Sequence, residues 1–432
     1  MQVSIFSEIN PLKSVLIHRP GNEHSFVDPM NLSEWIPENN TITHNPNYLL
    51  FDDLINPEKA MKEHDLLSQV INNFIGEENC IEFITLLIDI INNIELRKEL
   101  LKECLELEDS INNINNFNSK LSELISMDTH EILHVLLTGF NTYDNGIQFF
   151  KHPIPNLIFT RDIAAVIGKT ILLTWGCKTV RNRENILAKF IFNYHEIFND
   201  TKTYNFNEHH PNLSVEGGDI IILDDKTICI GISERTSSET IDALLPLFFQ
   251  EGFLNVYAFD LPKCRSMMHL DTIFNRINNK EVIVFPPMFL SSETNNETLT
   301  IHCISNGQKF NEGKKTTQSF LELIKNNGLE LTPIKCGGDK KLHQAREQWM
   351  DGANYFTISP GIIIGYGRNH HTIIELKKAG YKCIDAIEFL KNKHLFDNQS
   401  KLMISIPSAE LSRGRGGARC LTLPLIRKEN ND

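Results

Sequence analysis

Two stretches of the chain repeat one pattern: DIAAVIGKTI at Asp162–Ile171 and DIIILDDKTI at Asp219–Ile228. Each has an aspartate, an apolar run, a turn and then Lys-Thr-Ile, with the lysine seven residues after the aspartate. This pattern predicts two short strands joined by a turn, and a helical pattern follows each copy, at Asn185–Phe198 and Glu239–Gln250. The second copy continues into a predicted strand at Leu254–Phe259. The sequence therefore predicts a repeated strand–strand–helix–strand unit.

Weaker copies of this unit occur elsewhere in the chain. One lies at Glu281–Phe289, and another at Thr357–Gly365 is followed by a predicted helix at Thr372–Ala379 and a strand at Tyr381–Ile384. An opening copy begins at Ser14–His18. Repeated units bury their open faces against their neighbours, which favours a closed ring of blades. The predicted fold class is thus α/β, with five pseudo-symmetric units.

One segment departs from the repeat. From about Pro57 to Gly139 the apolar residues recur at three- and four-residue spacing, which predicts four or five helices. The Asn-rich run at Asn112–Asn118 is expected to be an interhelical loop. We therefore expect residues 1–56 to form the first part of a catalytic domain, residues 57–139 an inserted helical bundle and residues 140–432 the remainder of that domain.

Composition excludes several classes of protein. The chain has 432 residues and a net charge of −13, with no basic stripe, which argues against a nucleic-acid partner. No stretch approaches the length of a membrane span, and no signal peptide is visible at the N-terminus, so we expect no membrane partner. The nine cysteines include no C-x-x-C pair, which fits a reducing, cytoplasmic location. A homo-oligomer stays open.

Four segments carry dense polar residues among apolar strands. They are NLIFTRD at Asn156–Asp162, VEGGD at Val215–Asp219, MHLD at Met268–Asp271 and RGRGGARC at Arg413–Cys420. If MHLD is a strand, the side chains of His269 and Asp271 share one face. The paired glycines of VEGGD allow a positive φ or a close approach of the backbone to a ligand. The glycine-rich loop can place a thiol beside a substrate.

Each of these residues also has a structural interpretation. One cysteine among nine is usually a small buried apolar side chain, so Cys420 alone is weak evidence for catalysis. His269 could be a satisfied core histidine or half of a metal site. A catalytic site is favoured because a thiol, a histidine, several acids and two arginines occur together. Arg181 follows Asp162 by 19 residues, and Arg235 follows Glu216 by the same 19.

This set, in this order, resembles the arginine deiminase family of the guanidino-group-modifying, or pentein, superfamily. The resemblance covers nearly the whole chain. Besides the four segments it includes LKSVLIHRPG at Leu12–Gly21, LFDDL at Leu50–Leu54, SERT at Ser233–Thr236, REQ at Arg346–Gln348 and GYGRN at Gly365–Asn369. It implies a five-bladed α/β propeller, the pentein fold, with an inserted helical domain.

The resemblance also implies a role for each polar residue. It makes Cys420 the nucleophile, His269 and Glu216 the acid/base pair, and Asp162 and Asp271 the carboxylates that hold the guanidinium. The implied substrate-binding residues are Asn156, Phe159, Arg181, Asp219, Arg235 and Arg415. Among these Arg181 and Arg235 hold the substrate carboxylate, and Arg415 is a mobile gating arginine. No metal and no cofactor is implied.

Two positions depart from the commonest family pattern. Ile163 follows Asp162 where proline is frequent, which could loosen that turn. Arg419 precedes Cys420 where some members have histidine, and a second cation beside the thiol should favour the thiolate.

The implied reaction is hydrolysis of L-arginine to citrulline and ammonia. A guanidinium is planar and charged, so carboxylates can orient it while a thiolate attacks its carbon. An agmatine deiminase or another guanidine-modifying hydrolase is the nearest alternative, and the two arginines argue against agmatine, which has no carboxylate. A non-catalytic propeller and a zinc hydrolase using His269, Asp271 and His209 or His210 are alternatives of other classes; the second lacks the usual ligand spacing.

Overall fold

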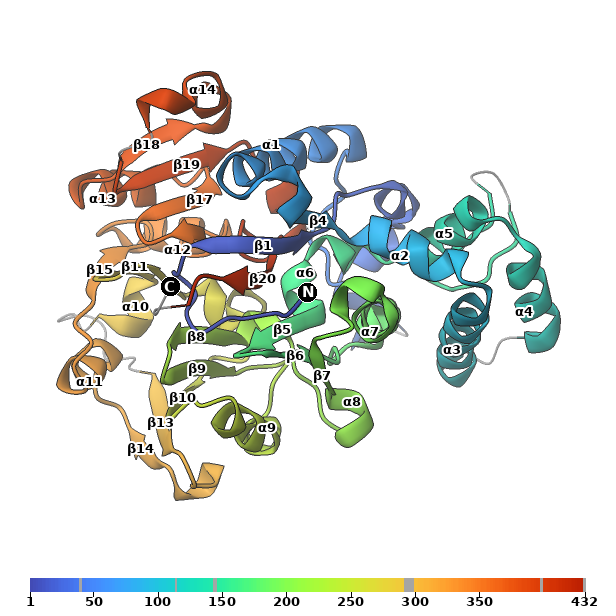
Figure 1. Cartoon of the computed structure of the whole chain (residues 1–432), viewed down its shortest axis with the longest axis horizontal. Helices are drawn as coiled ribbons and strands as arrows, with labels where there is room; N and C mark the ends of the chain where they lie inside the picture. The colour runs from blue at the N-terminus through green and yellow to red at the C-terminus, as the bar shows by residue number, and fades with distance from the viewer. Residues whose placement is uncertain (39–40, 113–114, 143–145, 291–298, 397–398, 430–432) are drawn as a thin grey trace.

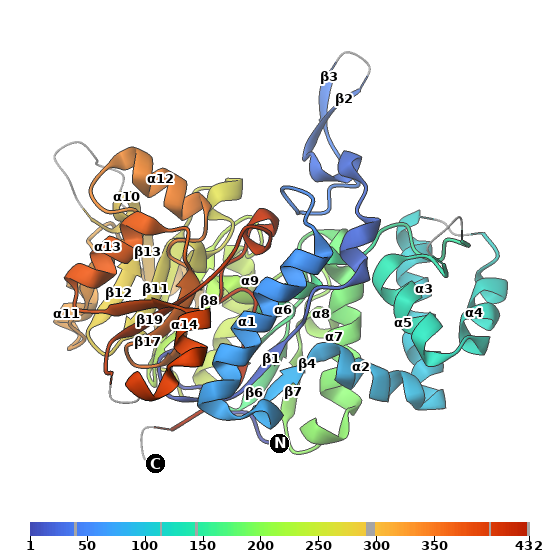
Figure 2. The same cartoon turned by 90° about the horizontal axis from the view of Figure 1, so that it is seen from above.

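The computed structural model describes residues 1–38, 41–112, 115–142, 146–290, 299–396 and 399–429. It is an α/β structure, and five sheets among these residues share one arrangement (Figures 1 and 2). In each, a central strand pairs antiparallel with one neighbour and parallel with the other. The shared three strands of each sheet, in sheet order with the central strand second, are as follows: in the first, β20 (Leu423–Arg427), β1 (Leu12–Ile17) and β4 (Cys80–Glu82); in the second, β5 (Ala164–Ile167), β6 (Thr170–Leu173) and β7 (Lys202–Asn205); in the third, β8 (Ile220–Asp224), β9 (Thr227–Ile232) and β10 (Asn255–Asp260); in the fourth, β11 (Phe274–Asn278), β12 (Glu281–Val284) and β15 (Thr332–Lys335); and in the fifth, β16 (Phe356–Ser359), β17 (Ile362–Tyr366) and β19 (Leu402–Ile406).

The two clearest sequence copies form the hairpins that were predicted. β5 pairs with β6 and β8 with β9, both antiparallel, and a helix follows each hairpin: α7 (Asn182–Tyr194) and α9 (Ser238–Gln250). The Ser237 hydroxyl accepts a hydrogen bond from the backbone N–H of Thr240, which begins α9. These hairpin strands are buried along almost their whole length, so their sequences are continuous apolar runs instead of alternating ones.

The later copies form with one difference in pairing. The hairpin β16–β17 is followed by α13 (His370–Lys378) and β18 (Lys382–Asp385), close to the predicted helix and strand. However, β17 pairs with β19, and β18 lies outside β19 at the sheet edge. The sheet of β8–β10 is also extended, by β13 (Thr300–Ser305) and β14 (Lys314–Thr316). In the fourth unit α11 (Phe320–Asn326) precedes β15.

The first sheet joins the two ends of the chain, because β1 pairs with β20. Helix α1 (Pro57–Ile75) begins at the Asn56 cap, whose side chain accepts the Lys59 N–H, and it packs against β1 and β4. By contrast α2 (Phe83–Asn92), α3 (Ile94–Asn112), α4 (Phe117–Ser126) and α5 (Thr129–Thr138) pack on one another and on α7, and they extend away from the sheets in Figure 1.

The segment predicted as one helical bundle, 57–139, therefore has two surroundings in the structure. Its first helix and β4 belong to the first sheet, whereas α2–α5 form a separate layer. The Asn-rich run divides likewise: Asn112 ends α3, Phe117 begins α4, and residues 113–114 lie outside the described residues.

Consecutive units lie against one another. β20 contacts β5, β1 contacts β16, and β11 contacts β16, while α6 (Thr160–Ile163) contacts η7 (Gly217–Asp219), which contacts η9 (Leu270–Thr272). The hairpin of β2 (Trp35–Glu38) and β3 (Thr41–His44) projects from this body in Figure 2. Among the described helices, none combines the length and the apolar character needed to cross a bilayer.

Candidate active site

The four polar segments converge because each lies just before the first strand of a sheet. Asp162 precedes β5, Glu216 precedes β8, His269 precedes β11, and Cys420 precedes β20. A cavity of about 20 Å³ lies between them, which is room for about one water molecule. Nine of the predicted residues line it: Asn156, Phe159, Asp162, Arg181, Glu216, Arg235, His269, Arg415 and Cys420.

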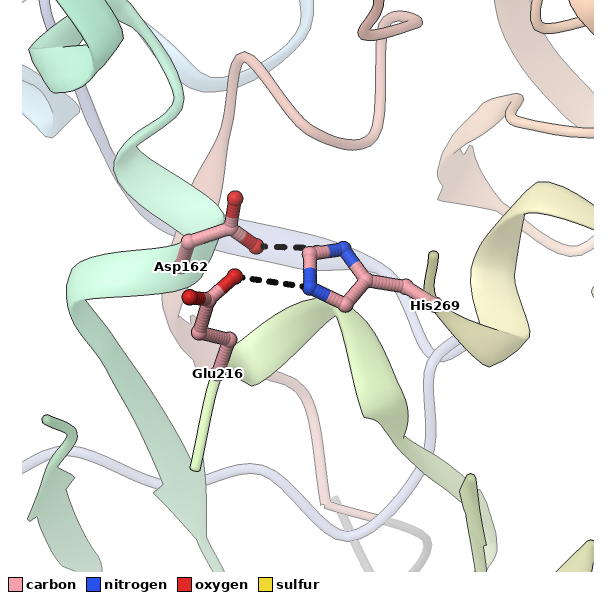
Figure 3. A group of neighbouring side chains, drawn as sticks. All are labelled: Asp162, Glu216 and His269. Carbon is pink, nitrogen blue, oxygen red and sulfur yellow. Dashed lines mark hydrogen bonds and ion pairs between the residues drawn. The ribbon is translucent and has the colours of Figure 1, made fainter. Parts of the chain in front are cut away.

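A buried histidine lies between two carboxylates at the centre of the site (Figure 3). Nε2 of His269 is 2.8 Å from Oε2 of Glu216, and Nδ1 is 3.8 Å from Oδ1 of Asp162. Burial alone would lower the pKa of His269, but the carboxylates outweigh it and raise that pKa to about 9. The ring is therefore an imidazolium at neutral pH and can donate a proton.

The Glu216 carboxylate is held in its charged form. Burial acts to raise its pKa, but Arg235 and His269 more than compensate and place the pKa of Glu216 well below its usual range. A permanently charged acid beside His269 both orients the ring and stabilises its positive charge.

Two buried arginines contact these same acids. Arg181 places Nη1 2.8 Å from Oδ2 of Asp162 and Nε 2.9 Å from Oε2 of Glu184. Arg235 places Nη1 3.4 Å from Oε1 of Glu216. Arg235 is buried and lines the cavity, so it is not a surface residue paired with Glu234 or another exposed acid. Its Nε has no hydrogen-bond partner among the described residues.

Cys420 is buried in the wall of the same cavity. Its Sγ lies 3.7 Å from Oδ2 of Asp271, and its backbone N–H donates to Oδ1 of Asn354 at 3.1 Å. Burial, with Asp271 and Asp162 nearby, raises the pKa of the Cys420 thiol well above its usual value. The thiol is therefore neutral at neutral pH until another positive charge enters the site.

Arg419 was expected to favour the thiolate, and its charge does act in that direction. The effect is outweighed because Arg419 is already paired: Nη1 is 2.7 Å from Oδ2 of Asp271, and Nη2 is 2.9 Å from Oε1 of Glu8. Burial would raise the pKa of Glu8, which comes from the opposite end of the chain. The nearby guanidinium groups, that of Arg419 above all, outweigh this effect and hold the pKa at about 2. Ile163, the other departure from the family pattern, is buried as the last residue of α6.

Two predicted residues do not line the cavity. Asp271 was expected to share a strand face with His269, but it lies in the helical turn η9, and only His269 has an extended backbone. Asp219 is buried and accepts hydrogen bonds from the Ser233 and Thr236 hydroxyls, at 2.6 and 2.8 Å. These two bonds fix the loop that carries Arg235. The strand prediction for Met268–Asp271 was wrong, because Leu270 and Asp271 lie in the helical turn η9.

Glycines let the backbone pass close to the site. A Cβ at Gly218 would lie 2.5 Å from Nδ1 of His269 and 3.0 Å from Oδ1 of Asp162. A Cβ at Gly416 would collide with the ring of Phe159 and lie 3.1 Å from the Cβ of Cys420. Neither Gly217 nor Gly218 has a positive φ, and the groups close to the backbone at Gly218 are the side chains of His269 and Asp162. The close approach of this backbone to a ligand stays a prediction.

Arg415 is buried in the wall of the cavity. Its guanidinium carbon lies 3.8 Å from the ring centroid of Trp349, and its backbone is left-handed, with φ +66°. Nε and Nη1 have no hydrogen-bond partner among the described residues. A substrate larger than the present cavity can enter only if this side chain, or another part of the wall, moves.

Asp162, Glu216 and His269 could together offer one ligand atom each to a metal ion, all within 4.8 Å of one another. The adjacent guanidinium groups of Arg181 and Arg235 oppose a further cation there. The zinc alternative drawn from the sequence is wrong in its ligand set: His210 bonds to Tyr204, His209 stacks on Tyr204, and neither lines the cavity.

Sequence reasoning missed several residues around the cavity. Asn354 accepts a hydrogen bond from the Cys420 backbone, Glu8 pairs with Arg419, and Leu50, Arg265 and Asp351 line the wall. Part of the signal was present, since Leu50 lies in the quoted segment LFDDL, and Asn354, Glu8 and Asp351 are polar residues that the fold buries, whereas Arg265 is half-buried.

Comparisons with known proteins place the chain in a family. A family described as arginine deiminase matches residues 47–427. The arginine deiminase of Mycoplasma capricolum subsp. capricolum is 31% identical, and that of Borreliella afzelii is 33% identical. Both alignments cover 99% of this chain and 98% of the relative. Among solved structures, SxtG, an amidinotransferase from Microseira wollei, is 12% identical with a TM-score of 0.49, covering 100% of this chain and 98% of the other.

Proposed function

Because the chain belongs to the arginine deiminase family, whose members hydrolyse C–N bonds of linear amidines, we propose that it converts L-arginine to L-citrulline and ammonia through a covalent intermediate on Cys420. The observation that carries this proposal is the composition of one buried cavity. A thiol, a histidine–glutamate pair, a further carboxylate and two arginines all line it.

The substrate supplies the missing activation. When the cavity opens to admit arginine, the guanidinium binds between the carboxylate of Asp162, which lines the cavity, and that of Asp271, whose Oδ2 lies 3.7 Å from the thiol. This positive charge lowers the pKa of the Cys420 thiol, which is high in the free protein. The thiol then releases its proton to solvent, and the thiolate attacks the guanidinium carbon. Removing water from a closed cavity strengthens each of these charge interactions.

His269 handles the protons of the two following steps. As an imidazolium it protonates the departing amino group, so ammonia leaves and a thiouronium remains on Cys420. The neutral ring then takes a proton from water, whose oxygen adds to the same carbon. Collapse of that adduct expels the thiolate and, after loss of one proton, releases citrulline. Glu216 supports the charged ring throughout. The chain's own residues account for each step.

The two buried arginines favour arginine over agmatine. Arg181 and Arg235 face the cavity from neighbouring units, and a carboxylate on the substrate would match their positive charges. Agmatine has no carboxylate, so it would leave these guanidinium groups without that partner. A non-catalytic binding role would leave the buried thiol and the His269–Glu216 pair without a purpose.

We also propose that the five units close into a pentein propeller. The contacts between units support this, since they join the first unit to the second, each unit to the next, and the fifth to the first. The helical insertion is then best confined to α2–α5, with α1 and β4 in the first blade. The boundary expected at 56/57 then moves to the start of α2, whereas the boundary at 139/140, a cytoplasmic location and a homo-oligomer stay predictions.

A product assay tests the proposed function. The purified protein is dialysed against a chelator, incubated with arginine, and its products are separated by amino-acid analysis. We expect citrulline and ammonia in equal amounts, and agmatine to react far more slowly. Equal or faster turnover of agmatine would make this an agmatine deiminase, and a loss of activity that zinc restores would contradict the thiolate mechanism.

A further inference from the structure

One acid in the wall of the cavity has no assigned role. Asp351 lines the cavity and is buried, yet its Oδ2 has no hydrogen-bond partner among the described residues. The other two acids of this wall, Asp162 and Glu216, each form an ion pair with an arginine. A buried carboxylate oxygen without a partner is energetically costly, and at a binding site it indicates a missing ligand group.

A cation in the same wall is also incompletely paired. Nε and Nη1 of Arg415 lack hydrogen-bond partners, and its nearest ion-pair contact joins Nε to Oδ2 of Asp52 at 3.8 Å, beyond hydrogen-bond distance. Arg415 is also the main cation acting on Asp351. The wall thus presents one carboxylate and one guanidinium to the same small space.

The backbone holds Asp351 where it is. Helix α12 (Lys341–Trp349) ends two residues earlier, and Asp351 then turns the chain with a left-handed φ of +59°. A Cβ on the next residue, Gly352, would lie 2.7 Å from the carbonyl oxygen of Glu347, so the turn packs tightly. Three residues further, Asn354 bonds to the backbone of Cys420. Aspartate is one of the few non-glycine residues that adopt this conformation readily, so the turn can hold its side chain at the cavity.

The position of Asp351 in its unit also suggests that it belongs to the site. In four units the segment just before the first strand supplies Asp162, Glu216, His269 or Cys420 to the cavity. Asp351 lies in the corresponding segment of the fifth unit, before β16.

Counting charges identifies the group that fits. In the proposed function the substrate guanidinium lies between two carboxylates and the substrate carboxylate faces arginines, which leaves the α-ammonium group without a partner. We propose that the carboxylate of Asp351 binds the α-ammonium group of the substrate and so makes the site select an amino-acid head group. This inference rests on the proposed function and adds a residue that decides specificity.

Electrostatics support this assignment. Burial raises the pKa of Asp351 to about 7, so the carboxylate is poorly stabilised in the closed cavity. Arginine cannot fit in about 20 Å³, and if Arg415 withdraws to admit it, Asp351 loses its main counter-charge. An ammonium group would replace that charge at the moment of binding.

The test compares two substrates that differ only in this group: arginine, and 5-guanidinopentanoate, which is arginine without its α-amino group. For the wild-type protein we expect kcat/KM for 5-guanidinopentanoate to be about ten- to a hundredfold lower, the effect of one lost charge-assisted hydrogen bond. Asp351→Asn should lower kcat/KM for arginine by a similar factor. It should leave 5-guanidinopentanoate within about twofold of the wild-type value, because that substrate has no ammonium group to lose. Asparagine also tolerates the left-handed backbone.

Asp53→Asn is the matched control. Asp53 is an exposed acid, and it pairs with Arg413, which lies in the same glycine-rich segment as Arg415. It should leave the ratio of the two kcat/KM values unchanged. Equal use of both substrates by the wild type would overturn the inference, whether or not the variant folds. So would a loss in Asp351→Asn that is the same for both substrates, which would indicate a purely structural role. Failure of the wild type to make citrulline would instead overturn the proposed function.

Discussion

At the scale of single residues, the site consists of buried charges that neutralise one another. Asp162 and Glu216 are shared between the imidazolium of His269 and the guanidinium groups of Arg181 and Arg235. Each charge is stable in the interior because its partners are fixed. Substitutions here should therefore change both substrate binding and the protonation of neighbouring groups.

Arg235 gives the sharpest test of substrate recognition. Arg235→Ala should lower kcat/KM for arginine by about ten- to a hundredfold relative to agmatine, since a charge-assisted contact contributes about 1.5–3 kcal/mol. Because Arg235 also contacts Glu216, some activity on both substrates should be lost, but that common loss cancels in the ratio. Steady-state kinetics with the two substrates measure it, and an unchanged ratio would show that Arg235 does not contact the carboxylate.

His269 gives a prediction about protonation. Its pKa is raised from its ordinary value to about 9, so the ring should stay doubly protonated through neutral pH and lose a proton only as the pH rises through about 9. Glu216→Gln removes a carboxylate that raises this pKa and should shift the titration to lower pH. NMR of protein with ¹⁵N-labelled histidine follows both. A wild-type ring that titrates below pH 7 would exclude His269 as the proton donor in the free protein.

At the scale of elements, one position in each unit is used repeatedly. The segment before the first strand of the hairpin turns toward the middle of the molecule, and in four units it carries a predicted site residue. Short helical turns such as α6, η7 and η9 form these segments, and glycines allow them to approach one another. The strands fix the positions of these segments, and the segments carry the side chains that line the cavity.

Gly218 tests how closely these turns must pack. Gly218→Ala would place a methyl group 2.5 Å from Nδ1 of His269, so the ring must move away from its present position. We expect kcat/KM for arginine to fall by about a hundredfold, as a displacement of about 1 Å commonly causes. Gly367→Ala is the matched control, because a Cβ there meets Ser405 at an ordinary 3.4 Å. Similar small effects of both substitutions would contradict the packing described for η7.

The elements also show what the sequence could and could not predict. The hairpins β5–β6 and β8–β9 could be predicted, because their local apolar runs and turns are sufficient. The strand predicted at Met268–Asp271 was wrong, because an alternating polar pattern over four residues fits a helical turn equally well. The place of β4 in the first sheet could not be predicted, since it depends on pairing with β1 across a long helix.

The same limit applies to the site. Cys420, His269 and Glu216 could be predicted because their motifs are local and together resemble one family. The pairing of Arg419 with Glu8 joins residues 411 positions apart, and Asn354 reaches Cys420 from 66 positions away. No local pattern encodes such contacts. They depend on how the units are arranged around the cavity.

At the scale of the whole molecule, the arrangement keeps the Cys420 thiol protonated in the free protein. Consecutive units contact one another, and the thiol, the acids and the histidine are buried between them. Such burial raises the pKa of Cys420 and keeps it neutral. A guanidinium entering this space brings the charge that allows the thiolate to form, so activation depends on the correct substrate.

The central claim is that Cys420 attacks the substrate carbon, and mass spectrometry tests it most directly. The protein is mixed with arginine, quenched in acid within the first turnovers and digested, and the cysteine-containing peptides are analysed. We predict an amidino adduct of arginine, with ammonia lost, on the peptide that contains Cys420, and none in Cys420→Ser. An adduct on any of the other eight cysteines, or citrulline formation by Cys420→Ser at the wild-type rate, would contradict the account.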